Sequence, residues 1–212
     1  MLFELSRYRS PTGRFSEARA LVEGGRGALG DHLLGMWGPD GGAVPDRFLA
    51  LCLWPDFETR ERVHGALLDD PGQRSGVDPA LVDTEHWIVT ASAGAPGEIA
   101  LMQSDELYEF RFQEVVNGSQ PAAGRAFWER TRPEIEAAGG RVAGQFDVAL
   151  GPGRPVFVTI LAWADHPALF VGWRALDRSP AMVAGRQAET GGAGRSNFER
   201  PEQWLMRSMP PS

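Results

Sequence analysis

The histidines are the residues of this chain best suited to acid–base chemistry near neutral pH. There are four, at positions 32, 64, 86 and 166. An imidazole with a reference pKa of ~6.5 can accept a proton from a substrate and release it again. Their spacing does not match the His-x-x-x-His or Cys-x-x-Cys patterns of metal sites, so we predict no metal.

His64 is the candidate general base. We predict a helix over 56–69, in which positions 57, 60/61, 64 and 67/68 share one face. The only apolar surface available to that face is a sheet, so His64 should point between helix and sheet. A second stretch of the chain carries Trp173 at the equivalent position. The structural alternative is a core histidine hydrogen bonded to backbone, and a second chemical alternative is ligation of a haem iron.

That second stretch is an internal repeat. Residues 35–71 align with 144–180 without a gap. The positions that hold the same residue are Gly35/Gly144, Gly42/Gly151, Phe48/Phe157, Trp54/Trp163, Asp56/Asp165, Ala66/Ala175, Leu67/Leu176 and Pro71/Pro180. Repetition of this kind indicates that one supersecondary unit is built twice.

The predicted elements follow the order β-α-β-β-α-β in each half. In the first half they are 2–8, 14–28, 33–37, 47–54, 56–69 and 86–91. In the second half they are 107–113, a helix from 119, 142–150, 155–163, a helix from 165, and 203–206. We therefore predict an α+β fold with a first ferredoxin-like domain at 1–93, a linker at 94–104 and a second domain at 105–212. Each sheet has helices on one face only, so the two bare faces can close into a pseudo-dimeric α/β barrel.

Aromatic side chains give a second clue to function. Trp37, Trp54 and Trp87 fall on predicted strands of the first half, and we assign them, with Tyr8 and His32, as candidate substrate-binding residues. Large flat side chains around a concavity suit a planar, aromatic or apolar small molecule. The alternative is that these tryptophans form the core.

Polar side chains follow the first strand of each half on one side. If the apolar side faces the helices, this polar side faces the barrel centre, where charges must be paired. We expect Glu4 or Glu109 to meet Arg111 or Arg7. The residues of the two polar sides are Glu4, Ser6 and Tyr8, and Glu109, Arg111 and Gln113.

Composition excludes several classes of partner. The net charge of −7 argues against nucleic acid and against anionic membranes. The chain has no apolar run near the ~20 residues that span a bilayer. The single Cys52 and an N-terminus without the layout of a signal peptide favour a cytoplasmic protein.

Residues 3–8, 33–37, 51–54 and 66–71 together resemble the NIPSNAP family of the dimeric α/β-barrel superfamily. Residues 108–110, 138–144 and 161–163 resemble it in the second half, and Ser6 stands where that family commonly has an arginine. The resemblance implies an intramolecular pseudo-dimer, able to associate further, with a ligand space between helix and sheet. It favours an enzyme of bacterial specialised metabolism that catalyses a cofactor-independent oxygenation or cyclisation. The alternatives are haem binding through His64 and a non-catalytic scaffold.

Overall fold

The computed structural model describes residues 2–11, 13–40, 46–69, 83–92, 105–114, 124–151, 156–189 and 202–209. The predicted linker at 94–104 and the start of the helix predicted from 119 lie outside these residues. The eight strands are arranged as a closed barrel in the order β1-β3-β2-β8-β5-β7-β6-β4. The predicted α+β barrel is therefore confirmed.

By its internal contacts the chain divides into two units, each described separately below. The first unit comprises Met1–Val89, Ala149–Pro152 and Arg207–Ser212. The second comprises Thr90–Val148 and Gly153–Met206.

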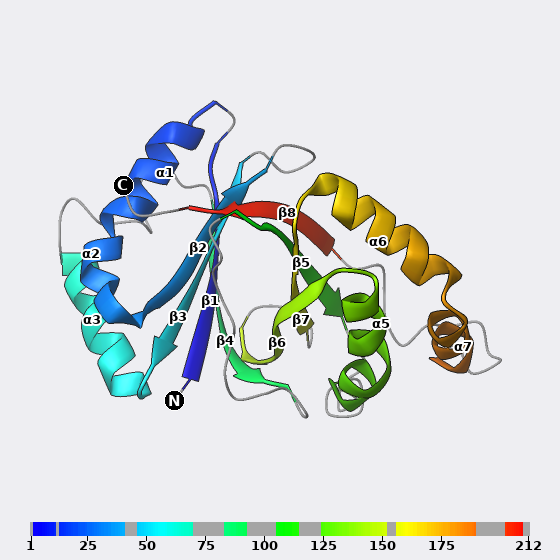
Figure 1. Ribbon diagram of the computed structural model, residues 1–212. Coiled ribbons are helices and arrows are strands. Elements are labelled where there is room, and N and C mark those ends of the chain that lie inside the picture. The colour runs from blue at the N-terminus through cyan, green and yellow to red at the C-terminus, as the bar shows by residue number, and fades with distance from the viewer. Residues whose placement is uncertain are drawn as a thin grey trace. The chain divides into compact units, whose positions relative to one another are not determined.

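The first unit is a four-stranded antiparallel sheet with its helices on one face (Figure 1). Strand β1 lies between β4 and β3, and β3 pairs with β2. The single helix predicted over 14–28 is instead two helices that meet at Gly25. The elements are β1 (Leu2–Arg9), α1 (Phe15–Gly24), α2 (Arg26–Leu29), the 3-10 turn η1 (Gly30–His32), β2 (Leu33–Pro39), β3 (Arg47–Trp54), α3 (Phe57–Asp69) and β4 (Asp83–Ala91).

The second unit has the same order of strands and helices, with β7 between β5 and β6. Its first helix contains a π-helical turn, η2, and the helix predicted from 165 is followed by a further helix, α7. The elements are β5 (Leu107–Glu114), η2 (Phe127–Thr131), α5 (Arg132–Ala137), β6 (Arg141–Leu150), β7 (Val156–Trp163), α6 (His166–Arg178), α7 (Pro180–Glu189) and β8 (Glu202–Ser208).

Several residues shared by the two aligned stretches have the same structural task in both units. Strand pairing shifts register between Leu33 and Gly35, and again between Val142 and Gly144. A Cβ added to Gly35 would lie 2.3 Å from the Trp37 ring, and one added to Gly144 would lie 2.8 Å from the Phe146 ring. Glycine is therefore required at both places because an aromatic side chain two residues later covers it.

The second helices of the two units begin at equivalent caps. The carboxylate of Asp56 accepts a hydrogen bond from the backbone N–H of Thr59 at 2.7 Å. Asp165 accepts one from Ala168 at 2.8 Å. These bonds satisfy N–H groups that have no partner inside the helix, so both helices start where the sequence predicted.

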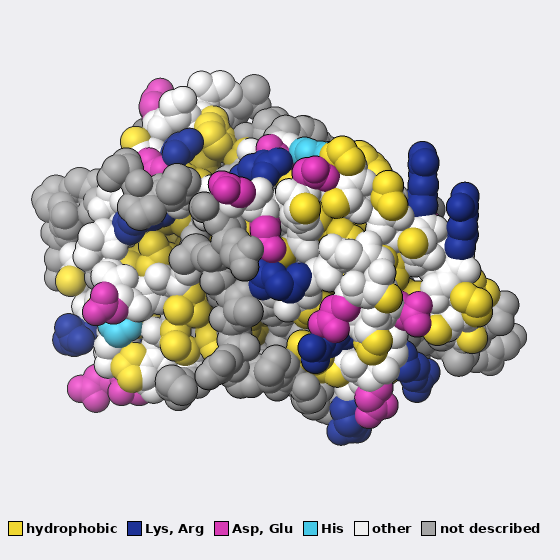
Figure 2. All heavy atoms as spheres, in the orientation of Figure 1, with side chains coloured by type: hydrophobic (Ala, Val, Ile, Leu, Met, Phe, Trp, Pro, Cys, Tyr) yellow, Lys and Arg dark blue, Asp and Glu magenta, His cyan; other side chains and the backbone are white. Residues whose placement is uncertain are grey.

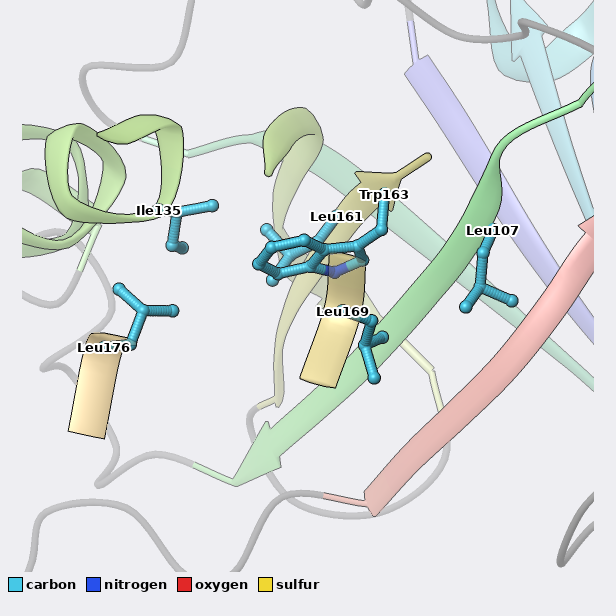
Figure 3. Close-up of a cluster of buried hydrophobic side chains, with 6 residues drawn as sticks. All are labelled: Leu107, Ile135, Leu161, Trp163, Leu169 and Leu176. Atoms are coloured by element: carbon cyan, nitrogen blue, oxygen red, sulfur yellow. The ribbon is translucent and has the colours of Figure 1, made fainter. Parts of the chain in front are cut away.

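Each unit has an apolar core between its helices and its sheet. In the second unit the core comprises Leu107, Ile135, Leu161, Trp163, Leu169 and Leu176 (Figure 3). In the first unit the positions equivalent to Leu161 and Trp163 are Cys52 and Trp54, which cluster with Leu29. A second cluster in that unit lies under α1 and comprises Ala18, Met36, Phe48 and Met209. On the outside, basic and acidic side chains are interspersed over the described parts of the visible face (Figure 2). In the described part of the chain, every helix is too short or too polar to span a membrane.

Candidate functional site

The buried carboxylate of Glu4 is the centre of the candidate site in the first unit. Glu4 lies on β1 and is 1% exposed. Four N–H-bearing side chains from β3, α3 and β4 surround its two oxygens. They are Trp54 (Nε1 to Oε2, 2.8 Å), Arg60 (Nη2 to Oε1, 2.7 Å), His64 (Nε2 to Oε2, 3.0 Å) and His86 (Nδ1 to Oε1, 3.1 Å).

Strand alternation and register bring these groups together. Glu4 and Ser6 are two residues apart on β1, so their side chains lie on the same face. Ser6 pairs directly with His86 on β4, which places the imidazole on that face as well. On α3, Arg60 and His64 are one helical turn apart and both reach the carboxylate. Phe57, expected on the same helical face, is instead 48% exposed in the first turn.

The polar side of β1 therefore faces the helices and not the barrel centre as predicted. The opposite side carries Leu5, which is fully buried and apolar. Arg7 lies on that apolar side, where its Nε is 3.4 Å from Glu85. Glu4 is paired instead with Arg60, which reaches it from the helix that covers this face of the sheet. The alternation was predicted correctly, but the face that the helices cover was not.

Hydrogen bonding fixes the charge of Glu4. Burial raises the pKa of its carboxyl, but hydrogen bonds from His64, His86 and Arg60 outweigh burial and hold the pKa far below its usual value. Glu4 is consequently an acceptor only at neutral pH. The ring nitrogens that face it, Nε2 of His64 and Nδ1 of His86, must carry hydrogen. In the neutral imidazoles the lone pairs then lie on Nδ1 of His64 and Nε2 of His86.

The two imidazoles are close to each other and partly open to solvent. Their ring centroids are 5.5 Å apart and their planes are nearly perpendicular. The His64 side chain is 24% exposed and that of His86 35%. The Ser6 hydroxyl lies 2.9 Å from Nδ1 of His86. Two oriented bases therefore share one buried carboxylate.

Four of the predicted site residues lie in or beside this cluster. His64 and Trp54 contact Glu4, and the His32 ring lies against Trp54 at 4.6 Å between centroids. The Tyr8 ring is 6.3 Å from that of His86.

Trp37 and Trp87 lie on the other face of the sheet. Trp37 pairs with Leu49, and Trp87 pairs with Leu5. The three tryptophans predicted to shape one pocket are therefore not brought together. Sequence reasoning also missed Arg60 and His86 as partners of Glu4.

The second unit builds the same frame around Glu109, which is fully buried. Its carboxylate accepts hydrogen bonds from Nε1 of Trp163 at 3.1 Å, Nε1 of Trp173 at 2.9 Å and Nε2 of Gln203 at 2.6 Å. Nε of Arg111 is 3.6 Å away, which is one of the glutamate–arginine pairings that the sequence left open. Trp173 thus occupies the position that His64 has in the first unit.

Electrostatics separates the two glutamates. Burial raises the pKa of Glu109, and Arg111 with the three hydrogen bonds only partly opposes it. Neutral indole and amide donors stabilise a carboxylate less than imidazoles and a hydrogen-bonded guanidinium do. Of the two buried glutamates, only Glu4 has imidazole partners. The imidazoles that contact a buried glutamate therefore lie in the first unit.

The residues of this site can be compared with the needs of a metal ion and of a haem iron. Among the described residues, no group of three or more His, Cys, Asp and Glu side chains is arranged to hold a metal ion. Nε2 of His64 is directed at Glu4. A haem iron would therefore have to bind Nδ1 or displace the carboxylate from Nε2.

Several solved structures are similar to this chain over nearly its whole length. An anthrone oxidase-like protein is similar over 99% of this chain and 91% of its own, with a TM-score of 0.68 and 14% sequence identity. A candidate monooxygenase from Lactobacillus acidophilus NCFM is similar over 98% of this chain and 93% of its own, with a TM-score of 0.54 and 12% identity. At these identities the likeness shows a shared fold. No family model and no curated protein matches the chain.

A NIPSNAP domain protein from Burkholderia xenovorans is similar over 45% of this chain and 99% of its own, with 24% identity and a TM-score of 0.37.

Proposed function

We propose that the chain is an enzyme of bacterial specialised metabolism that binds a flat, largely apolar small molecule and removes a proton from it at His64. The reaction is a cofactor-independent oxygenation or cyclisation. The observation that supports this most is the buried Glu4 carboxylate, which orients an imidazole that is partly exposed to solvent.

The pairing of Glu4 with His64 is the arrangement that a general base needs. The carboxylate fixes the ring orientation and the tautomer, and it stabilises the imidazolium that forms when Nδ1 takes a proton. Because Glu4 is itself held ionised, it does not compete for that proton. His86 presents its Nε2 nearby, where the imidazolium form could donate to an oxygen of the substrate anion.

An anthrone is the substrate class that we propose to test first. Its methylene carbon lies between two aryl rings and across from a ketone, so loss of a proton gives a delocalised enolate. That enolate is electron-rich enough to reduce dioxygen directly. Addition of O2 at the former methylene carbon and loss of water gives the quinone, so one anthrone and one O2 yield one anthraquinone and one water. The likeness to an anthrone oxidase-like protein supports this choice through the fold alone.

Proton abstraction can be measured apart from oxidation. Without oxygen, exchange of the anthrone methylene hydrogens in D2O reports the base alone, while oxygen consumption in air reports the whole reaction. His64→Ala should slow both by about 100-fold or more, because a positioned general base typically contributes 10²–10⁴-fold. The matched control is Trp173→Phe at the equivalent position of the second unit, which should stay within about twofold of wild type.

The two measurements separate the ways in which the proposal can fail. If wild-type protein neither exchanges nor oxidises anthrone, the substrate class is wrong. If wild-type protein is active and His64→Ala is equally active, His64 is not the base. Saturable binding of anthrone without exchange would favour a non-catalytic binding protein.

A further inference from the structure

A row of polar side chains crosses three strands of the second unit. Arg111 on β5 pairs directly with Thr159 on β7, and Thr159 pairs with Gln145 on β6. The three side chains share the face that carries Glu109, two residues from Arg111. Gln145 is 2% exposed and Thr159 is 1% exposed. We call Arg111, Thr159 and Gln145 the polar row.

The side chains of two members of the polar row make no hydrogen bond in the described part of the chain. Their unpartnered atoms are Nε2 and Oε1 of Gln145 and Oγ1 of Thr159, all of them buried. Nε of Arg111 makes no hydrogen bond either, although it lies 3.6 Å from Glu109. A buried polar group left without a partner costs roughly 1–3 kcal/mol, and folded proteins contain few of them. Three such atoms on two neighbouring side chains therefore need an explanation.

The fold does not require polar residues here. In the first unit the positions equivalent to Gln145 and Thr159 are Met36 and Ala50, which pair with each other across β2 and β3. Met36 packs in the apolar core under α1. The first unit thus shows that an apolar pair fills the same place on the sheet. The polar pair is a property of the second unit alone.

The segment that covers this part of the sheet is unusual as well. The π-helical turn η2 places the Phe127 ring 6.1 Å from the ring of Phe157, which neighbours Thr159 on the same face of β7. Single π-helical turns are rare and occur frequently at functional sites. Burial raises the pKa of Asp147, which pairs with Phe157, although Ser92 partly opposes this. Aromatic rings and hydrogen-bonding groups therefore meet beside the polar row.

We propose that the polar row is a binding site for a small, flat, neutral molecule with a hydrogen-bond donor and an acceptor on one edge, such as an aryl carboxamide. The side-chain amide of Gln145 offers an acceptor and a donor side by side, so a carboxamide can pair with it through two hydrogen bonds. The Thr159 hydroxyl supplies a third bond, and Phe127 and Phe157 lie where an aryl ring would pack. Arg111 does not demand an anion, because Glu109 already balances its charge.

This site is independent of the proposed base. Its residues belong to the second unit, whereas Glu4, His64 and His86 belong to the first. Either proposal can therefore fail without the other.

Benzamide, acetophenone and toluene form a matched set of probes for binding by ligand-observed NMR. Benzamide donates and accepts, acetophenone only accepts, and toluene does neither, so the expected order of affinity is benzamide, then acetophenone, then toluene. Gln145→Met, which installs the residue found at the equivalent position 36, should weaken benzamide binding about tenfold, because two hydrogen bonds are lost. It should leave toluene binding unchanged.

Two further variants complete the test. Thr159→Ala, which copies Ala50, should weaken benzamide by a smaller factor and serves if Gln145→Met fails to fold. His64→Gln should bind benzamide as wild type does. The proposal is overturned if benzamide binds no better than toluene, if both variants of the polar row retain wild-type affinity, or if a crystal soaked in benzamide shows only ordered water at Gln145.

Discussion

Replacement of the two buried glutamates by glutamine makes a matched pair of perturbations. Glu4→Gln removes the charge that holds Arg60 and two histidines. Arg60 is 16% exposed, so its guanidinium would lose the buried negative charge beside it and keep Glu61 as its acidic partner among the described residues. Loss of one member of a buried ion pair costs about 3–5 kcal/mol. Because Arg60 keeps Glu61, we expect Glu4→Gln to lower the free energy of unfolding by about 3 kcal/mol, the lower end of that range.

Glu109→Gln should behave differently although it makes the same chemical change. The amide oxygen introduced can still accept from Trp163 and Trp173, which are neutral donors. The carboxylate that is lost was disfavoured by burial. The cost of leaving Arg111 without its carboxylate is thus offset in part, and we expect a change within about 1 kcal/mol.

The pH dependence has opposite signs for the two variants. The folded pKa of Glu4 is lowered from a reference of 4.5, so its ionised form contributes stability that is present above about pH 4.5 and is lost as the pH falls. The gap between wild type and Glu4→Gln should therefore be full at pH 7 and shrink below pH 4.5. The folded pKa of Glu109 is raised, so its ionisation costs stability as the pH rises past 4.5 through the folded pKa. The stability of Glu109→Gln relative to wild type should therefore increase as the pH rises from 4.5 through the folded pKa of Glu109.

Urea unfolding between pH 3.5 and 8, followed by tryptophan fluorescence and by circular dichroism, measures both effects. An equal cost for the two variants at pH 7 would refute the contrast between the units. A gap between wild type and Glu4→Gln that widens as the pH falls would refute the assigned direction of the Glu4 pKa.

Two predictions concern other sites. Gly35→Ala should destabilise the protein by about 1–3 kcal/mol, because the new Cβ would lie 2.3 Å from the Trp37 ring. Gly65→Ala on α3 should stabilise it by about 0.5–1 kcal/mol, because nothing lies within 4 Å of the new Cβ. Thermal unfolding of both variants checks this contrast. Burial, with a smaller contribution from Glu4, raises the pKa of the Cys52 thiol to about 12. Cys52 should therefore resist an aromatic disulfide reagent at pH 8 in the folded protein and react at once in urea. The absorbance of the thiolate that the reagent releases measures both rates.

The sequence was sufficient to predict the element order, both helix caps and the direction of His64. These follow from local periodicity and from capping chemistry, which depend on neighbours a few residues away. The period of α3 also put position 60 on the face of His64, and an arginine on a face expected to be buried could have pointed to a carboxylate partner. Glu4 and Glu109, which occupy matching positions on the first strands, were the carboxylates available to such an arginine.

What the sequence could not supply was the orientation of each sheet. Alternation shows that Glu4 and Ser6 share a face, but not which face the helices cover. For the same reason the sequence did not show that Trp37 and Trp87 lie on the opposite face from Trp54, since successive residues along a strand point to opposite faces of the sheet. His86 was missed because its contact with Glu4 depends on the β1–β4 register, which is a long-range property.

The different sites of the two units follow from one requirement, that each buried glutamate must have a cation beside it. In the first unit the cation comes from the helix, as Arg60, and the strand position equivalent to Arg111 holds the small Ser6. In the second unit it comes from the strand, as Arg111, and the helix position equivalent to Arg60 holds Leu169, which packs in the apolar core. A cation on the helix leaves the carboxylate oxygens accessible to the partly exposed imidazoles of His64 and His86. A cation on the strand lies beside Thr159 in the buried middle of the sheet, where a polar row can extend from it. The element that supplies the arginine thus decides where each unit can bind or react.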